Sequence, residues 1–269
     1  MSSTDPAATG TPLTQHAVLD ELEFLATVEH ALIVECLTVS YALGYDLDPG
    51  EGGPAPGPAA DAASAASIQA QVHEMAHFRD ISNALVAAGR TARLDRAARL
   101  PDDPARAISL DPPDLAELRQ LITREQAIAA AVDARYVKLA PAVTSAPVFT
   151  DDPGPGGATS LGGLLGDMRA VIIDHGPVHA AMFANMIASL SGLAPEDYLR
   201  ATRRDTADSF EQRLLDVSDR AYGVVLGVLR DQFGPPPGPG SEAVPSMQTL
   251  DDINRLLAQR GLLPPFTSS

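Results

Sequence analysis

Apolar residues recur at helical spacing in four long segments of the chain, and glycine or proline punctuates each end. We place the predicted helices, in chain order, at residues 13–43, 62–88, 113–139 and 161–190. Gly44 and Gly89 are the expected C-terminal caps of the first two. The long, proline-broken connection between the second and third helices is typical of an up-down four-helix bundle with one crossover.

The remaining segments divide the chain into three parts. Residues 48–60 and 150–163 are rich in Gly and Pro and are expected to be long loops. Residues 1–12 form a disordered N-terminus in this interpretation, and residues 13–192 form the bundle. Residues 193–269 form a helical C-terminal extension packed on it, with one or two helices near 195–231 and a short amphipathic helix at 249–259.

Composition supports an all-α fold, because Ala and Leu dominate the apolar residues and no strand-like run of Val, Ile and Thr occurs. The net charge of −16 disfavours nucleic acid and anionic membranes as partners. The single Cys36 fits a reducing compartment, and residues 1–11 lack the features of a secretory signal. The longest apolar stretch is interrupted by charged residues, so no membrane span is expected. We therefore expect a cytoplasmic protein.

All six histidines lie in the first, second and fourth predicted helices. Four of them form the i, i+4 pairs His73/His77 and His175/His179, a spacing that puts both rings on one helix face. The second helix also carries the Glu-x-x-His step Glu74/His77, which di-iron and di-manganese bundles use for metal binding. Its neighbours Met75, Ala76 and Phe78 are apolar, which favours a buried position.

The first and third helices each carry a carboxylate on an apolar stripe. Glu29 shares its face with Leu22, Leu25 and Ile33, and Glu125 has the same kind of surroundings on the third helix. A carboxylate in such a place is costly unless it is paired or binds metal. Both are candidate ligands, and pairing of Glu29 with an arginine, or an ordinary surface role for Glu125, remain alternatives. Glu35 lies a third of a turn from Glu29 and is the weaker candidate.

At this point the chain resembles the ferritin-like superfamily. Residues 28–32 and 41–44 resemble the first helix of those domains, and residues 74–78 with 83–89 resemble the second. Glu125 falls where the family has its third-helix carboxylate. The resemblance covers about residues 14–192 and implies a centre of two metal ions, usually iron, with oxygen chemistry or metal oxidation.

The fourth helix departs from that pattern. A second Glu-x-x-His step ending at His179 or at His175 would need a carboxylate at Gly176 or Ile172, and neither is acidic. Pro177 predicts a kink or π-bulge, which could bring Asp174 or His175 into the place of the missing Glu. A site richer in imidazole shifts metal preference towards zinc or copper, so these and manganese stay open beside iron.

The expected function is that of an oxidase or oxygenase for a small organic substrate. The predicted metal ligands are Glu29, Glu74, His77, Glu125 and His179, with Asp174 or His175 completing the set. The expected partner is that substrate, and a homodimer is compatible with the sequence. The bias to Ala, Pro and Arg over Lys suggests a bacterial protein of specialised metabolism.

Two alternatives use the same residues differently. His73-Glu74-Met75-Ala76-His77 matches the HExxH helix of zinc hydrolases, although the convincing strands that usually accompany it are missing from the sequence pattern. A ferritin-like scaffold or small-molecule binder that has lost its ligands is the other alternative. Metal content separates the three interpretations: two ions favour the bundle enzyme, one zinc the hydrolase, and none the scaffold.

Overall fold

The computed structural model describes residues 15–44, 57–91, 94–95, 119, 177–234 and 243–266. The helices in this part of the chain are α1 (Gln15–Ala42), α2 (Pro58–Ala87), a helical segment over residues 177–190, α5 (Pro195–Tyr198), α6 (Ser209–Gln232) and α7 (Ala243–Gln259). Strand pairing within the described residues is limited to one parallel bridge between Arg203 and Leu262. The third predicted helix lies outside the described residues, except for Arg119.

Two helices begin earlier than predicted, and each has a proline in its first turn. Gly44 and Gly89 adopt φ of 77° and 75°, as expected for glycine caps. However, α2 begins at Pro58, inside a stretch that the sequence assigned to a loop. Helix α7 likewise begins at Ala243, six residues before the predicted start, and includes Pro245. Proline is tolerated in the first turn of a helix, because the N–H that it lacks would have no partner there.

Helix α6 has a well-defined start. The Asp208 side chain accepts hydrogen bonds from the backbone N–H groups of Phe210 and Glu211, both at 2.8 Å. These contacts satisfy two of the N–H groups that a helix leaves without intrahelical partners. The region for which we predicted one or two helices therefore contains the short α5, an extended connection and the long α6.

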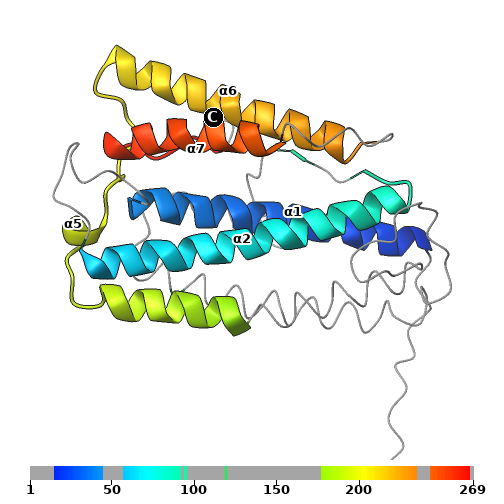
Figure 1. Cartoon of the computed structure of the whole chain (residues 1–269), viewed down its shortest axis with the longest axis horizontal. Coiled ribbons are helices and arrows are strands. Elements are labelled where there is room, and N and C mark those ends of the chain that lie inside the picture. Colours follow the sequence, from blue (N-terminus) through cyan, green and yellow to red (C-terminus); the bar gives the residue numbers. More distant parts are fainter. Residues whose placement is uncertain are drawn as a thin grey trace, which may run out of the picture.

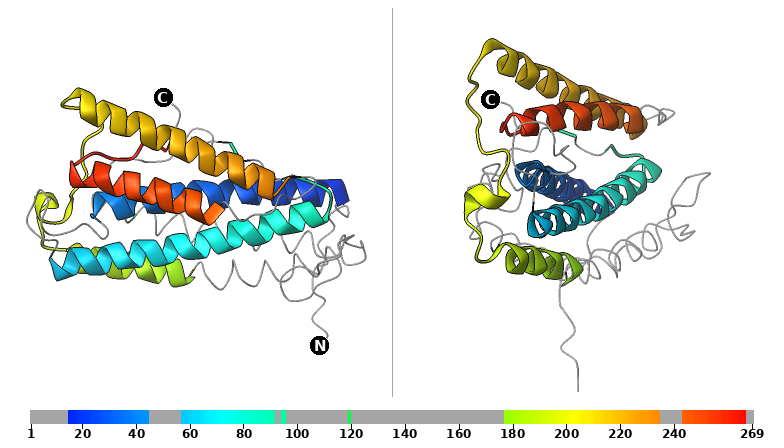
Figure 2. Two further views of the ribbon diagram at one scale, coloured as in Figure 1. Left: turned by 45° about the horizontal axis from the view of Figure 1, so that its top comes forward. Right: turned by 60° about the vertical axis from the view of Figure 1, so that its left-hand side comes forward.

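The helices are arranged in layers around α1 and α2, which run antiparallel (Figure 1). The α6–α7 pair covers one side of these two helices, and the segment 177–190 lies on the opposite side (Figure 2). Helix α1 is consequently buried around its whole circumference between Val28 and Cys36. Its sequence has little amphipathic character for the same reason, since no face needs to be polar.

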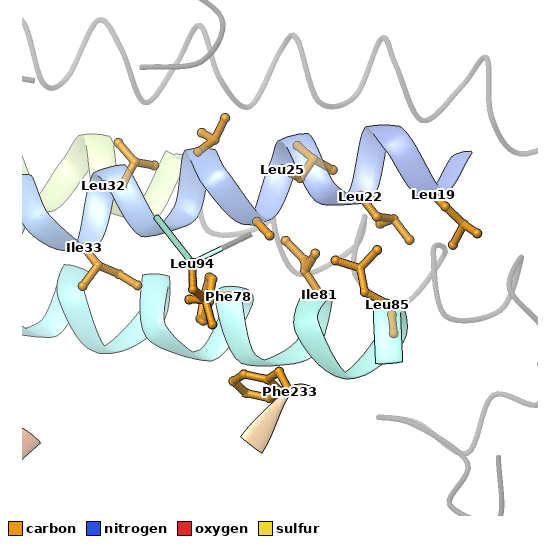
Figure 3. Close-up of a cluster of buried hydrophobic side chains, with 13 residues drawn as sticks. Leu19, Leu22, Leu25, Leu32, Ile33, Phe78, Ile81, Leu85, Leu94 and Phe233 are labelled. Carbon is orange, nitrogen blue, oxygen red and sulfur yellow. The ribbon is translucent and has the colours of Figure 1, made fainter. Parts of the chain in front are cut away.

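The core holds the middle layer together. Leu22 and Leu25 of α1 pack with Ile81 and Leu85 of α2, and Phe233 at the end of α6 approaches the same cluster (Figure 3). A second cluster joins α1 to α6, α7 and the C-terminal residues, and a third joins α1 and α2 to the segment 177–190. Among the described residues, no helix combines the length and apolar character that crossing a membrane requires.

Candidate metal centre

Two acidic residues from different helices meet in the interior. Glu29 of α1 and Glu74 of α2 are almost completely buried. His77, one turn after Glu74, lies between them: its Nδ1 is 3.3 Å from Glu29 Oε2 and 3.2 Å from Glu74 Oε2. Ligand atoms of these three residues lie within 4.8 Å of one another. The Glu-x-x-His step thus faces the carboxylate of α1, as the helical spacing predicted.

His179 brings the segment 177–190 into contact with the same group. Its Nδ1 lies 2.7 Å from Glu74 Oε1, and its ring is buried. The two oxygens of Glu74 therefore face different imidazoles, with Oε2 toward His77 and Oε1 toward His179. We call Glu29, Glu74, His77 and His179 the carboxylate–histidine cluster.

His73 lies at the edge of the cluster and is partly exposed. Its Nδ1 is 3.1 Å from His179 Nε2, and the two rings stack with centroids 5.3 Å apart. The i, i+4 spacing to His77 pointed to this residue, but we did not include it among the predicted ligands. His73 and His179 are 106 residues apart in the sequence. The spacing of residues within one helix therefore cannot predict their contact.

The two buried carboxylates differ in protonation. Burial, and next the neighbouring Glu74, raise the pKa of Glu29 well above its usual range. Burial acts in the same direction on Glu74, but hydrogen bonds with Glu29, His179 and His77 outweigh it and lower that pKa. The proton therefore resides on Glu29, and Glu74 is the carboxylate that stays ionised. This difference follows first from the hydrogen bond between the two carboxylates, and next from the bonds of Glu74 to His179 and His77.

The neighbouring histidines respond to these carboxylates in opposite ways. Burial disfavours a charged His77, but its hydrogen bonds to Glu29 and Glu74 outweigh burial and raise its pKa to about 10. Partial burial, followed by the nearby His179 and His77, lowers the pKa of His73. Without metal, the inner histidine thus carries a proton that balances the ionised Glu74.

The donor set fits a metal ion. Carboxylate oxygens and imidazole nitrogens are the ligands of di-metal bundle sites, and here they converge from three helices. Two buried carboxylates are unfavourable unless protons or cations compensate them. A bound cation would take the place of the protons held by Glu29 and His77.

Other predicted ligands cannot be placed. Glu125, Asp174 and His175 lie outside the described residues, so the structure leaves their role as a prediction. The described helical segment starts at Pro177, so the kink predicted at this proline also stays a prediction. Glu35 is buried like Glu29 but does not belong to the group of converging ligand atoms.

Comparison with known proteins bears on the fold. The sequence matches no model of a known protein family and no curated protein. The structure is similar to the crystal structure of a ferritin-like protein from Caulobacter vibrioides, with a TM-score of 0.65 over 96% of this chain and 99% of that chain. The sequences are 15% identical, so the likeness concerns the fold. The chain has an all-α, ferritin-like fold, and this prediction is confirmed.

Proposed function

We propose that this ferritin-like chain is a cytoplasmic metalloenzyme that binds two metal ions, with iron as the first choice. We further propose that it acts as an oxidase or oxygenase on a small organic molecule. The observation that carries the proposal is the carboxylate–histidine cluster, in which buried carboxylate and imidazole groups from three helices converge. A ferritin-like fold is compatible with a dinuclear site at this place.

The residues of the cluster suit distinct tasks in holding metal. Glu74 presents one oxygen to His77 and the other to His179, so these three side chains would hold the metal together. Glu29 would add its carboxylate after losing its proton. We keep Glu125, together with Asp174 or His175, as the proposed remaining ligands.

Iron bound in this centre would supply oxygen chemistry. The protein's own contribution is the dry environment, since Glu29, Glu74, His77 and His179 are all buried and bulk water is excluded from their ligand atoms. In the metal-free protein, the Glu29 carboxyl holds a proton next to the ionised Glu74, and metal binding would release that proton. Before metal binds, the buried ion pair of Glu74 with His77 keeps both side chains in position.

Metal content of the purified chain tests the proposal. We expect two metal ions per chain in the wild type, and loss of bound metal in Glu74→Ala and His77→Ala. The matched control is Asp61→Ala, which removes an exposed carboxylate from the first turn of the same helix and should leave the metal content unchanged. Full metal retention in both cluster variants would contradict the site. One zinc per chain would instead favour the hydrolase, and no metal in the wild type the scaffold.

A second measurement addresses the reaction. The chain is reconstituted anaerobically with Fe(II) and then exposed to oxygen while its optical spectrum is recorded. We expect an oxygen-triggered absorbance change that Glu74→Ala abolishes. A wild type that binds two ions but shows no such change would retain the metal site and refute the oxidase or oxygenase.

A further inference from the structure

A cavity of about 310 Å³ lies between α1 and α2 on one side and α6 and α7 on the other. This volume is at the lower end of the range of roughly 300–1,000 Å³ that small-molecule sites occupy. The four residues of the carboxylate–histidine cluster are not part of its lining. Helix α1 instead presents Glu29 to the cluster and the next residue, His30, to the cavity.

Most of the cavity wall is apolar. Ile33 and Leu37 of α1, Met75 of α2, and Val225 and Leu229 of α6 contribute aliphatic or thioether side chains. Such a wall favours a ligand that is itself mainly apolar, because burying polar groups against it would leave them without hydrogen bonds. We therefore expect most of the ligand's surface to be apolar.

The polar groups at the α7 side have their charges compensated. The Tyr41 hydroxyl donates to Asp251 Oδ1 at 2.7 Å, and Asp251 Oδ2 forms an ion pair with Arg255, also at 2.7 Å. Burial, with Asp251 next in effect, raises the pKa of Tyr41, so this hydroxyl stays protonated and keeps its bond to the carboxylate. The charge of Asp251 is thus balanced within the protein, and the cavity does not require a charged ligand.

Asn254 of α7 supplies the group that needs a partner. Its side chain lines the cavity and is 0% exposed. Oδ1 accepts a 2.6 Å hydrogen bond from the Ser218 hydroxyl. Nδ2 is a weak donor to the Tyr41 hydroxyl and so opposes the rise of its pKa, but it makes no other hydrogen bond with the described residues, which leaves at least one of its two N–H groups without an acceptor. A buried amide donor without an acceptor is unfavourable.

His30 lies in the wall on the side of the cavity formed by α1. Its Nε2 is 2.9 Å from the Tyr222 hydroxyl, so these two polar groups of the wall are paired with each other. A ligand carboxylate near Asn254 would face the carboxylate of Asp251, which disfavours a negatively charged ligand.

We propose that this cavity binds a neutral, mainly apolar small molecule through a carbonyl oxygen that accepts a hydrogen bond from Asn254 Nδ2. The site is separate from the carboxylate–histidine cluster, and the inference does not depend on metal binding. It assigns the α6–α7 pair a ligand-binding role at a site that the residues of the cluster do not line.

The test compares two probes of similar shape, 4-phenyl-2-butanone and butylbenzene, by ligand-observed NMR titration of the full-length chain. We expect the ketone to bind about tenfold more tightly, equivalent to about 1.4 kcal/mol. Asn254→Leu should remove this difference while butylbenzene still binds. Equal affinity of the wild type for both probes would refute the role of Asn254, and binding of neither would refute the site.

A steric pair of variants places the binding in the cavity. Leu229→Trp fills it from α6 and should abolish binding of the ketone. Val224→Trp adds the same side chain to the same helix at a position that is 56% exposed, and should bind as the wild type does. Unchanged ketone binding in Leu229→Trp would overturn the proposal. The wild-type chain has no Trp, so indole fluorescence verifies that each new side chain is buried or exposed as designed.

Discussion

His179 Nδ1 lies 2.7 Å from Glu74 Oε1, a contact between residues 105 positions apart that joins the segment 177–190 to α2. The same carboxylate contacts His77 through its other oxygen, at 3.2 Å. Among the described residues, Glu29 contacts the imidazole of His77, at 3.3 Å. The hydrogen bond between the two carboxylates, together with the imidazoles at Glu74, gives them different charges in the metal-free protein, and this difference can be measured.

We expect Glu29→Gln and Glu74→Gln to differ in stability without metal. A neutral amide replaces a protonated carboxyl at Glu29, so the free energy of unfolding should change by less than about 1 kcal/mol. At Glu74 the amide removes the buried negative charge beside His77, which should cost about 3–5 kcal/mol. Chemical unfolding at pH 7 in the presence of a chelator measures both. Equal losses would show that the proton is not held mainly by Glu29.

His73→Ala should weaken metal binding without changing the number of ions bound. His73 contacts and stacks on His179, and loss of such a supporting partner typically reduces metal affinity about 10- to 100-fold. Competition with a chromophoric chelator measures the affinity. Val72→Ala, at an exposed neighbouring position, is the control. Complete loss of metal from His73→Ala would instead make His73 a ligand, as the HExxH interpretation requires.

His30 should make the protein less stable in mild acid. Burial lowers its pKa from 6.5 to about 4, a change that Asp95 only partly opposes. Between these pH values the unfolded chain binds a proton that the folded chain does not, so stability falls as pH falls from 6.5 to 4. The loss is on the order of 3 kcal/mol in total.

His30→Gln tests this explanation, because glutamine does not titrate and can still bond to the Tyr222 hydroxyl. Unfolding free energies measured from pH 7 to 4 should decline less steeply in this variant than in the wild type. Tyr222→Phe removes the hydrogen bond but leaves the buried imidazole, and should keep the steep decline. Parallel curves for wild type and His30→Gln would exclude His30 as the cause.

Phe233→Ala should destabilise the attachment of α6 to the middle layer. Phe233 is 3% exposed and meets the Phe78 ring edge to face, with centroids 6.1 Å apart. Truncation of such a side chain costs about 3–5 kcal/mol. Phe210, at the other end of α6, is 44% exposed and lies against the Arg260 guanidinium, so Phe210→Ala should cost about 1 kcal/mol or less. Thermal unfolding that ranked the two variants the other way would contradict this packing.

The sequence predicted the parts of the fold and site that depend on one helix at a time. Glu29 stood out because a carboxylate interrupts an apolar stripe, and Glu74 with His77 because their spacing puts both on one face. Burial of all three follows from these local patterns. The helical content was predictable for the same reason, since Ala and Leu at helical spacing determine it.

Contacts between different helices could not be predicted from patterns within a single helix. The contact between His73 and His179 depends on how the segment 177–190 crosses α2. The apolar residues that pack these two segments together do not reveal the crossing in the sequence. The cavity is an extreme case, because four helices contribute to its wall and Asn254 differs from a surface asparagine only through its tertiary surroundings. The start of α2 at Pro58 was missed because proline was interpreted as a loop signal, although it also suits the first turn.

The burial of α1 on all sides has a consequence for how the protein can evolve. A mutation that shifts α1 to reshape the cavity would also displace Glu29 relative to Glu74, and a change in the cluster would move His30. Selection on either site would therefore act on both, and new ligand preferences are more accessible through α6 and α7, which line the cavity without contributing to the cluster.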